Sequence, residues 1–217
     1  ARVHRRQLDR LPGLPDQRAR LVYAGTGLAH PGLDLRVVVG RSGDDLGQFL
    51  GAGPGAVELH PGGLEIGASL VLLELGPVGL GAVVNAAYRG ARIIAVDGVP
   101  YRADYARRLG ADTVLDPTDP QALQAVLDLT GGLGADKALD CSGNARAERF
   151  CLDAVRRRGQ VTFVGECNDE LTLRVSPDLL RKGIAIHGSW HYNLNLYPQV
   201  MQVIQRSPVA AQLISHT

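Results

Sequence analysis

The chain has 217 residues, of which 45% are hydrophobic and 21% are charged, so it can bury a core and is not a disordered tail. Its formal net charge of +1 at pH 7 predicts no nucleic-acid partner and no membrane surface, and no apolar run reaches the roughly 18 residues that a membrane helix needs. The three cysteines form no C-x-x-C pair, which predicts neither a zinc ribbon nor a disulfide framework and favours a reduced, cytoplasmic setting.

Apolar, strand-like stretches alternate with helix-like stretches from Ser69 onward. The predicted strands are residues 69–75, 91–97, 113–115, 137–141, 160–165 and 184–188. The predicted helices are residues 78–89, 101–109, 121–129 and 145–155, with Gly110 ending the second and Asp119 capping the third. Because each crossover between parallel strands needs a helix, this alternation predicts an α/β fold, a doubly wound Rossmann sheet of six parallel strands.

The first 68 residues differ from the rest of the chain. They are rich in glycine and arginine and show little sustained periodicity, although residues 35–39 fit a strand. We therefore expect an irregular N-terminal segment, residues 1–68, and a Rossmann domain, residues 69–217, that includes the start of a C-terminal return segment. The N-terminal segment is either the remnant of a larger domain or an arm without compact structure.

A glycine-rich loop joins the first predicted strand to the first helix, in residues 72–82. Gly76 would let the backbone approach a pyrophosphate, and Gly79 would let the helix pack closely on the strand. The helix N-terminus would offer free N–H groups to the phosphates. Glu74 stands where the first glycine of the G-x-G-x-x-G pattern belongs, so we expect strain in the turn, repulsion of the pyrophosphate and weakened cofactor affinity.

An acidic residue, Asp97, ends the second predicted strand, 21 residues after Gly76. A carboxylate at this distance accepts hydrogen bonds from the adenosine ribose hydroxyls and repels a 2′-phosphate, which favours NAD over NADP. The alternative is that Asp97 simply caps a turn before residues 98–100.

The chain from residue 69 to 217 resembles the zinc-dependent medium-chain alcohol/polyol dehydrogenases. The matching stretches, in order, are Gly76-Pro-Val-Gly-Leu-Gly, Gly90-Ala-Arg-Ile-Ile-Ala-Val-Asp, Arg108-Leu-Gly-Ala-Asp, Thr130-Gly-Gly-Leu-Gly-Ala-Asp, Leu139-Asp-Cys-Ser-Gly-Asn, Arg158-Gly-Gln-Val-Thr-Phe-Val-Gly-Glu, and Arg181-Lys with His187-Gly-Ser-Trp. The resemblance implies an NAD-dependent oxidoreductase, seen as its cofactor-binding half, that transfers hydride between an alcohol or polyol and NAD. The cofactor-binding residues that it implies are Gly76, Pro77, Val78, Gly79 and Asp97, with Arg102 on the adenine side, Ser142 and Gly143 by the adenosine half, and Val164, Gly165, Ser189 and Trp190 near the nicotinamide.

The catalytic half of that family is not recognisable in this sequence. Zinc is expected for the family, but Ala24 occupies the position that resembles a ligand cysteine, and an alanine methyl group binds no metal. His187 and His191 are four residues apart, but Gly188 lies between them, so we assign no metal ligand. The sequence identifies no catalytic residue either. Two alternatives to the enzyme therefore stay open: a non-catalytic NAD-binding module, and an oligomerisation domain that has lost nucleotide binding.

Residues 171–175 alternate apolar and polar side chains, which predicts a strand at the edge of the sheet. An unpaired edge is open to pairing with other strands, and in the resembled family such edges pair across a two-fold axis. We therefore expect a homodimer or a higher homo-oligomer.

Overall fold

The computed structural model describes residues 37–38, 67–190 and 194–214, with the backbone alone for the first pair. The strands are β1 (Val37–Val38), β2 (Ser69–Leu73), β3 (Arg92–Val96), β4 (Thr113–Leu115), β5 (Ala135–Asp140), β6 (Val155–Phe163) and β7 (Ala185–Gly188). The helices are α2 (Pro77–Tyr88), α3 (Pro100–Leu109), α4 (Ala122–Leu129), α5 (Ala145–Ala154), the π-helix η1 (Val175–Leu180), the 3₁₀-helix η2 (Leu194–Leu196), α6 (Tyr197–Arg206) and the 3₁₀-helix η3 (Ala210–Leu213). In these ranges no helix combines the length and the apolar character needed to cross a bilayer.

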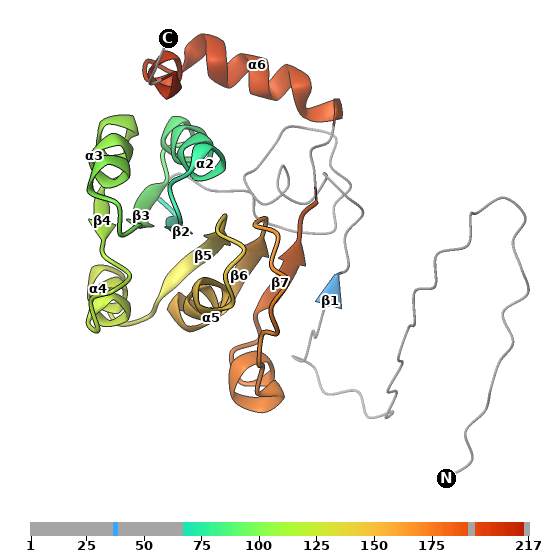
Figure 1. Ribbon diagram of the computed structural model, residues 1–217. Coiled ribbons are helices and arrows are strands. Elements are labelled where there is room, and N and C mark those ends of the chain that lie inside the picture. Colours follow the sequence, from blue (N-terminus) through green and yellow to red (C-terminus); the bar gives the residue numbers. More distant parts are fainter. Residues whose placement is uncertain (1–36, 39–66, 191–193, 215–217) are drawn as a thin grey trace, which may run out of the picture. The chain divides into compact units, whose positions relative to one another are not determined.

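All the strands are parallel and form one sheet in the order β1-β7-β6-β5-β2-β3-β4 (Figure 1). Strands β2 to β7 are the six predicted strands, so the doubly wound Rossmann fold is confirmed, and β1 adds a short seventh strand beside β7. The chain runs outward from β2 to β4 and then crosses back to place β5 on the other side of β2. The order therefore reverses between β2 and β5, the point at which open α/β sheets bind ligands.

Two apolar clusters cover the two faces of the sheet. Alternate residues of β2 divide between them: Leu70 and Leu72 pack with α2 and α3, whereas Val71 and Leu73 pack with α4 and α5. Figure 1 shows these two pairs of helices on opposite faces. Burial on both faces explains why β2 is a continuous apolar run in the sequence.

The boundaries of several elements differ from the prediction for identifiable reasons. Helix α3 ends as predicted, because Gly110 adopts a left-handed φ of 114°. Helix α4 begins at Ala122 with Gln121 at the capping position, and the Asp119 carboxylate accepts the Gln121 N–H at 2.8 Å. Asp119 therefore organises the turn before the helix instead of occupying the capping position itself.

Strand β6 begins five residues before its predicted start at residue 160. Ala135 of β5 pairs with Val155 of β6. The register then shifts, and the next pair is Lys137 with Gln160. The first of the intervening arginines is stabilised in the strand by a contact that is distant in sequence: Arg156 Nε donates to Asp136 Oδ1 at 2.6 Å. A run of three arginines does not resemble a buried strand, so this extension was missed.

The predicted edge strand at residues 171–175 is wrong. Residues 171–174 form neither helix nor strand, and the π-helix η1 begins at Val175. The alternating pattern has another cause, because Leu171 and Leu173 pack against the cluster that covers β5 and β6. The homodimer prediction is therefore no longer supported by an unpaired edge strand at these residues.

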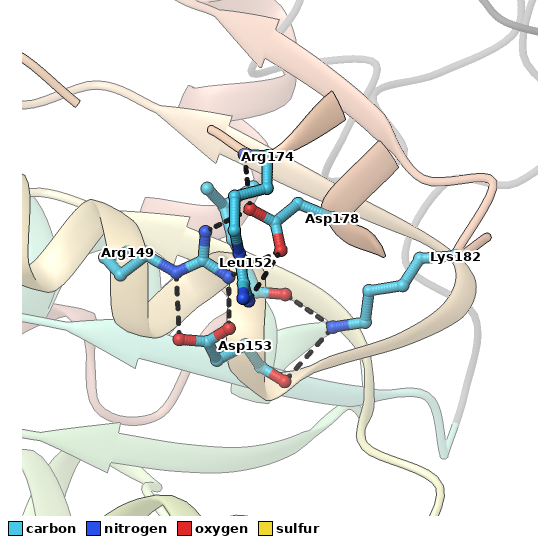
Figure 2. Close-up of polar contacts among 6 residues, drawn as sticks. All are labelled: Arg149, Leu152, Asp153, Arg174, Asp178 and Lys182. Atoms are coloured by element: carbon cyan, nitrogen blue, oxygen red, sulfur yellow. Dashed lines mark hydrogen bonds and ion pairs between the residues drawn. The ribbon is translucent and has the colours of Figure 1, made fainter. Parts of the chain in front are cut away.

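A network of charged groups instead joins η1 to the end of α5 (Figure 2). Arg149 Nη1 lies 2.6 Å from Asp178 Oδ2 and also pairs with Asp153, one turn further along α5. Asp178 is buried and accepts the Arg174 N–H at 2.8 Å, while Lys182 Nζ donates to the Leu152 carbonyl at 2.6 Å. Hydrogen bonds from Arg149 lower the pKa of Asp178 to about 2, so this carboxylate stays ionised at neutral pH.

Candidate functional site

The candidate site residues follow five different strands at their carboxyl ends. They are Gly76, Pro77, Val78 and Gly79 after β2, Asp97 and Arg102 after β3, Ser142 and Gly143 after β5, Val164 and Gly165 after β6, and Ser189 and Trp190 after β7. Because all these strands are parallel, their carboxyl ends meet at one edge of the sheet, beside the N-terminus of α2 (Figure 1).

The loop between β2 and α2 leaves the helix N-terminus open to an anion. Gly76 is the capping residue of α2, no side chain caps the helix, and its first turn contains no acidic residue. The first intrahelical bond joins the Leu80 N–H to the Gly76 carbonyl at 2.9 Å, so the N–H groups before it have no acceptor in the helix. A Cβ atom at Gly76 would meet nothing within 4 Å, whereas one at Gly79 would lie 1.8 Å from the Glu74 carbonyl oxygen. Gly79 thus permits the close approach of helix and loop, and open space lies above Gly76.

Glu74 adopts the backbone conformation that a glycine would take. Its φ is +63°, in the left-handed region, where a side chain costs roughly 1–2 kcal/mol. Its side chain is 38% exposed, and its carboxylate accepts a hydrogen bond from Arg102 Nη1 at 3.0 Å. The expected strain at this turn is therefore present, and the carboxylate is held by a guanidinium of α3.

Asp97 links the phosphate loop to the turn after β3. Its Oδ2 accepts the Leu75 N–H at 2.8 Å, and its Oδ1 accepts the Val99 N–H at 2.7 Å. Arg102 Nη1 lies 3.6 Å from Oδ2, and only 3% of the Asp97 side chain is exposed. The turn-capping role that the sequence left open is thus present, and the same carboxylate also fixes the loop that precedes α2.

The loops after β5 and β6 touch each other. Gly143 has a φ of +66°, and a Cβ atom there would lie 2.2 Å from the Glu166 carbonyl oxygen. A Cβ atom at Gly165 would lie 2.0 Å from the Gly143 nitrogen. Glycine is therefore required at both positions, because the two backbones cross at van der Waals distance.

Asp140 holds this crossing in place and was missed as a site residue. The fully buried carboxylate accepts the N–H groups of Ser142 and Gly143, both at 3.1 Å, and the Ser142 hydroxyl at 2.5 Å. The carbonyl of Asp140 accepts the Val164 N–H at 2.9 Å. An acidic residue that ends a buried strand just before Ser-Gly was the available signal in the sequence.

The end of β7 combines a buried hydroxyl with an exposed indole. Ser189 donates its N–H to the Phe163 carbonyl at 2.9 Å, while its buried hydroxyl has no hydrogen-bond partner among the described residues. The hydroxyl of Thr162 on β6 is in the same situation. Trp190 is half-exposed.

No metal-binding cluster forms within the described part of the chain, where no three or more His, Cys, Asp or Glu side chains could hold one ion. His187 is buried on β7, whereas His191 and Ala24 lie outside the described residues. Burial raises the pKa of the Cys141 thiol to about 12 and raises that of Cys151 as well, so neither is a thiolate at neutral pH. These two cysteines thus pack with the apolar core and are not poised as nucleophiles.

Comparison with known proteins identifies the family. A family model described as zinc-binding dehydrogenase matches residues 77–206, more than half of the chain. L-threonine 3-dehydrogenase of Symbiobacterium thermophilum is 32% identical over 138 residues, which are 59% of this chain and 39% of that protein. Sorbitol dehydrogenase of Bacillus subtilis is 32% identical over 143 residues, 65% of this chain and 40% of that protein. An uncharacterized zinc-type alcohol dehydrogenase-like protein of Escherichia coli is 40% identical over 124 residues, 56% of this chain and 35% of that protein. The chain thus spans less than half the length of these relatives.

Solved structures agree with the sequence comparison. An alcohol dehydrogenase from Thermotoga maritima superposes with a TM-score of 0.66 and 28% identity, over 73% of this chain and 44% of that one. An alcohol dehydrogenase zinc-binding domain protein from Burkholderia ambifaria has a TM-score of 0.59 and 30% identity, over 67% of this chain and 41% of that one. The family match and the shared fold show that this chain belongs to the zinc-binding, medium-chain dehydrogenase family.

Proposed function

We propose that this chain binds NAD and provides the cofactor-binding part of an alcohol or polyol dehydrogenase. The observation that carries the proposal is the uncapped N-terminus of α2, with open space above Gly76 and Asp97 held at its side. Helix N-termini bind phosphate through free N–H groups and the helix dipole. An acidic residue after the second strand of such a fold recognises the adenosine ribose.

The chain's own residues would orient the cofactor along the carboxyl edge of the sheet. The pyrophosphate would bind at Gly76, Pro77 and Val78, and the adenosine half would lie toward Arg102 and Ser142. The nicotinamide would lie toward the ends of β6 and β7, with its C4 atom accepting or donating the hydride. The residues assigned to this end are Val164, Gly165, Ser189 and Trp190.

The substrate belongs to the same proposal. Relatives of this chain include proteins named sorbitol dehydrogenase and scyllo-inosose 3-dehydrogenase, which indicates a small alcohol or polyol. Zinc would polarise such an alcohol, but the described residues do not assemble a set of metal ligands, so no step through zinc is assigned to them.

The experiment that tests the NAD site compares the affinities for NADH and NADPH in the wild type and in Asp97→Asn. Two unit charges about 4 Å apart interact by about 1–4 kcal/mol between the limits of water and a protein surface, so loss of the carboxylate should narrow the preference for NADH by about tenfold. The ratio is the readout because the variant also weakens the hydrogen bonds that Asp97 accepts from Leu75 and Val99.

Asp104→Asn provides the matched control, because Asp104 is an exposed residue of α3 that pairs with Arg107 of the same helix. The ratio of its affinities for NADH and NADPH should equal that of the wild type. If Asp97→Asn leaves the ratio of the NADH and NADPH affinities unchanged, Asp97 does not contact the adenosine ribose.

An oligomerisation domain without nucleotide binding is the second candidate, favoured by Glu74 in the phosphate loop. It predicts no binding of NADH or NADPH by a chain that forms a defined oligomer in gel filtration. The first proposal also includes a homodimer by resemblance to the family, and a monomer at micromolar concentration would contradict that part of it.

A further inference from the structure

Basic side chains gather at the amino ends of β6 and β7, the end of the sheet opposite the candidate cofactor site. Residues 156–158 belong to the start of β6, and residues 181–182 precede β7. The Arg158 N–H donates to the Lys182 carbonyl at 2.8 Å, so the two segments lie side by side. The π-helix η1, orange in Figure 1, lies at the same end of the sheet. We call this surface the basic edge, and its charged residues are Arg149, Arg156, Arg157, Arg158, Arg174, Arg181, Lys182, Asp136, Asp153 and Asp178.

The charges of the basic edge do not balance. Seven of these side chains are cationic and three are carboxylates, a net charge of +4 in a chain whose formal net charge is +1. The carboxylates are already engaged, and the pairs are Asp153 with Arg149, Asp178 with Arg149 and Arg174, and Asp136 with Arg156 (Figure 2 shows the first three). The exposed side chains of Arg157, Arg158 and Arg181 have no partner among the described residues. Three guanidiniums are therefore free to bind the anionic groups of another molecule.

Arg158 keeps its side chain at a backbone position that favours glycine. Its φ is +59°, in the left-handed region, where the Cβ atom crowds the following carbonyl oxygen. Glu74, at the candidate cofactor site, is the other non-glycine residue with a positive φ in the described part of the chain. Strained backbone of this kind concentrates at functional sites, so it marks Arg158 as a side chain with a role beyond packing.

Two exposed apolar side chains of η1 lie among these arginines. Val175 is 59% exposed and follows Arg174, and Leu180 is 38% exposed and precedes Arg181. The Arg181 N–H donates to the Ser176 carbonyl at 2.9 Å, so residues five apart lie one turn apart in η1. Val175 and Leu180 have the same spacing. They therefore share one face of η1, beside the free guanidiniums.

The size and composition of the basic edge favour a protein partner over nucleic acid or a membrane. Proteins that bind nucleic acid through its backbone contact about 6–10 phosphates, and three free guanidiniums fall well short of that number. Segments that bind anionic lipids carry about 4–8 Lys or Arg side chains in a cluster, again more than are free here. Arginines beside exposed apolar side chains are typical of protein–protein interfaces.

We propose that the basic edge is a docking surface for an acidic protein segment, whose carboxylates bind Arg157, Arg158 and Arg181 while an apolar side chain packs on Val175 and Leu180. Guanidinium and carboxylate groups match in geometry and form paired hydrogen bonds, which fix the register of the bound segment. The inference goes beyond the proposed NAD binding. The basic edge lies at the amino ends of the strands and the NAD site at their carboxyl ends, so the acidic segment and NADH bind independently.

The experiment titrates two fluorescent peptides with the protein and follows their anisotropy. One peptide is hexaglutamate, and the other has a leucine in place of one central glutamate. An exposed ion pair is worth a factor of about two to five in an equilibrium constant, so Arg157→Gln/Arg181→Gln should bind both peptides about tenfold more weakly than the wild type. The difference should shrink in high salt, which screens the pairs. Val175→Thr should weaken only the leucine peptide, by about threefold, because it removes one exposed methyl group from the surface.

The control is Arg206→Gln, because Arg206 is an exposed arginine of α6 and its loss changes the net charge in the same direction. It should bind both peptides as the wild type does. Absence of peptide binding by the wild type, or equal affinities in the control and in Arg157→Gln/Arg181→Gln, would refute the docking surface. An unchanged affinity of Val175→Thr for the leucine peptide would refute the apolar contact.

Two further ligands test the choice of partner and the position of the site. Tighter binding of a single-stranded DNA oligonucleotide or of phosphatidylserine vesicles than of the leucine peptide would overturn the protein segment as the partner. NADH should leave the affinity for the peptide unchanged, and displacement of the peptide by NADH would place it at the cofactor site instead. A chain that binds the peptide but not NADH would refute the proposed function and leave the docking surface intact.

Discussion

Gly79 and Gly81 lie two residues apart in α2, and we expect their substitution by alanine to change the free energy of unfolding in opposite directions. Gly79→Ala places a Cβ atom 1.8 Å from the Glu74 carbonyl oxygen and 2.9 Å from its carbonyl carbon. The contact is with backbone, which cannot rotate away as a side chain can. Gly81→Ala, in the same helix, places a Cβ atom that meets nothing within 4 Å.

The magnitudes follow from the two environments. Alanine is favoured over glycine in a helix by about 1 kcal/mol, so Gly81→Ala should raise the free energy of unfolding by about that amount. At Gly79 the same gain is opposed by overpacking, which costs about 3 kcal/mol at the upper end of the usual range. Gly79→Ala should therefore be about 2 kcal/mol less stable than the wild type, and the two variants should differ by about 3 kcal/mol.

Urea denaturation followed by circular dichroism measures both values, with the slope of the transition confirming that the same amount of surface is exposed. The midpoint should fall for Gly79→Ala and rise for Gly81→Ala. Equal stability of the two variants would refute the close approach of α2 to the phosphate loop, and with it the geometry that leaves the helix N-terminus open.

Two further predictions concern titrating groups. The pKa of Asp178 is about 2 against an ordinary value of 3.8, because hydrogen bonds from Arg149 favour its charged form, so its contribution to stability is present above about pH 4 and is lost as the pH falls toward 2. In Asp178→Asn this acid-dependent loss should be absent from urea midpoints measured between pH 5 and pH 2, and an unchanged pH profile would contradict the assignment. Because burial raises the pKa of Cys141 and Cys151, an alkylating reagent at pH 7.5 should modify Cys167 first, as peptide mass spectrometry would show. Earlier modification of Cys151 would contradict its burial.

The strands of the sheet could be predicted because each carries its own signal. Leu70 to Leu73 and Ile93 to Val96 are apolar without interruption, since the sheet is buried on both faces. The phosphate loop was predictable for a similar reason, because its glycines and its place between strand and helix are local features. Gly110 likewise ended α3 through its own backbone conformation.

The errors arose where the structure depends on contacts that are distant in sequence. The start of β6 is stabilised by Arg156 and Asp136, 20 residues apart, in a run of arginines that resembles a solvated surface. The false edge strand had the correct alternation, but its leucines face the core from a segment without strand partners. Periodicity reports which side chains are buried, and it does not report whether the backbone is paired.

The same reason explains what was missed at the candidate site. The sequence identified Glu74 as an unfavourable residue but gave no sign that Arg102, 28 residues later, holds its carboxylate. The network that joins Arg149 to Asp178, 29 residues away, was equally invisible. Pairs of this kind depend on which loops the topology brings together at the edge of the sheet.

Calorimetric titration of the purified wild-type protein with NADH and, separately, with NADPH tests most directly whether this chain binds NAD. We expect saturable binding of NADH and much weaker binding of NADPH, because Asp97 disfavours a 2′-phosphate. Equal affinity for the two cofactors, or binding of neither, would contradict the proposed function.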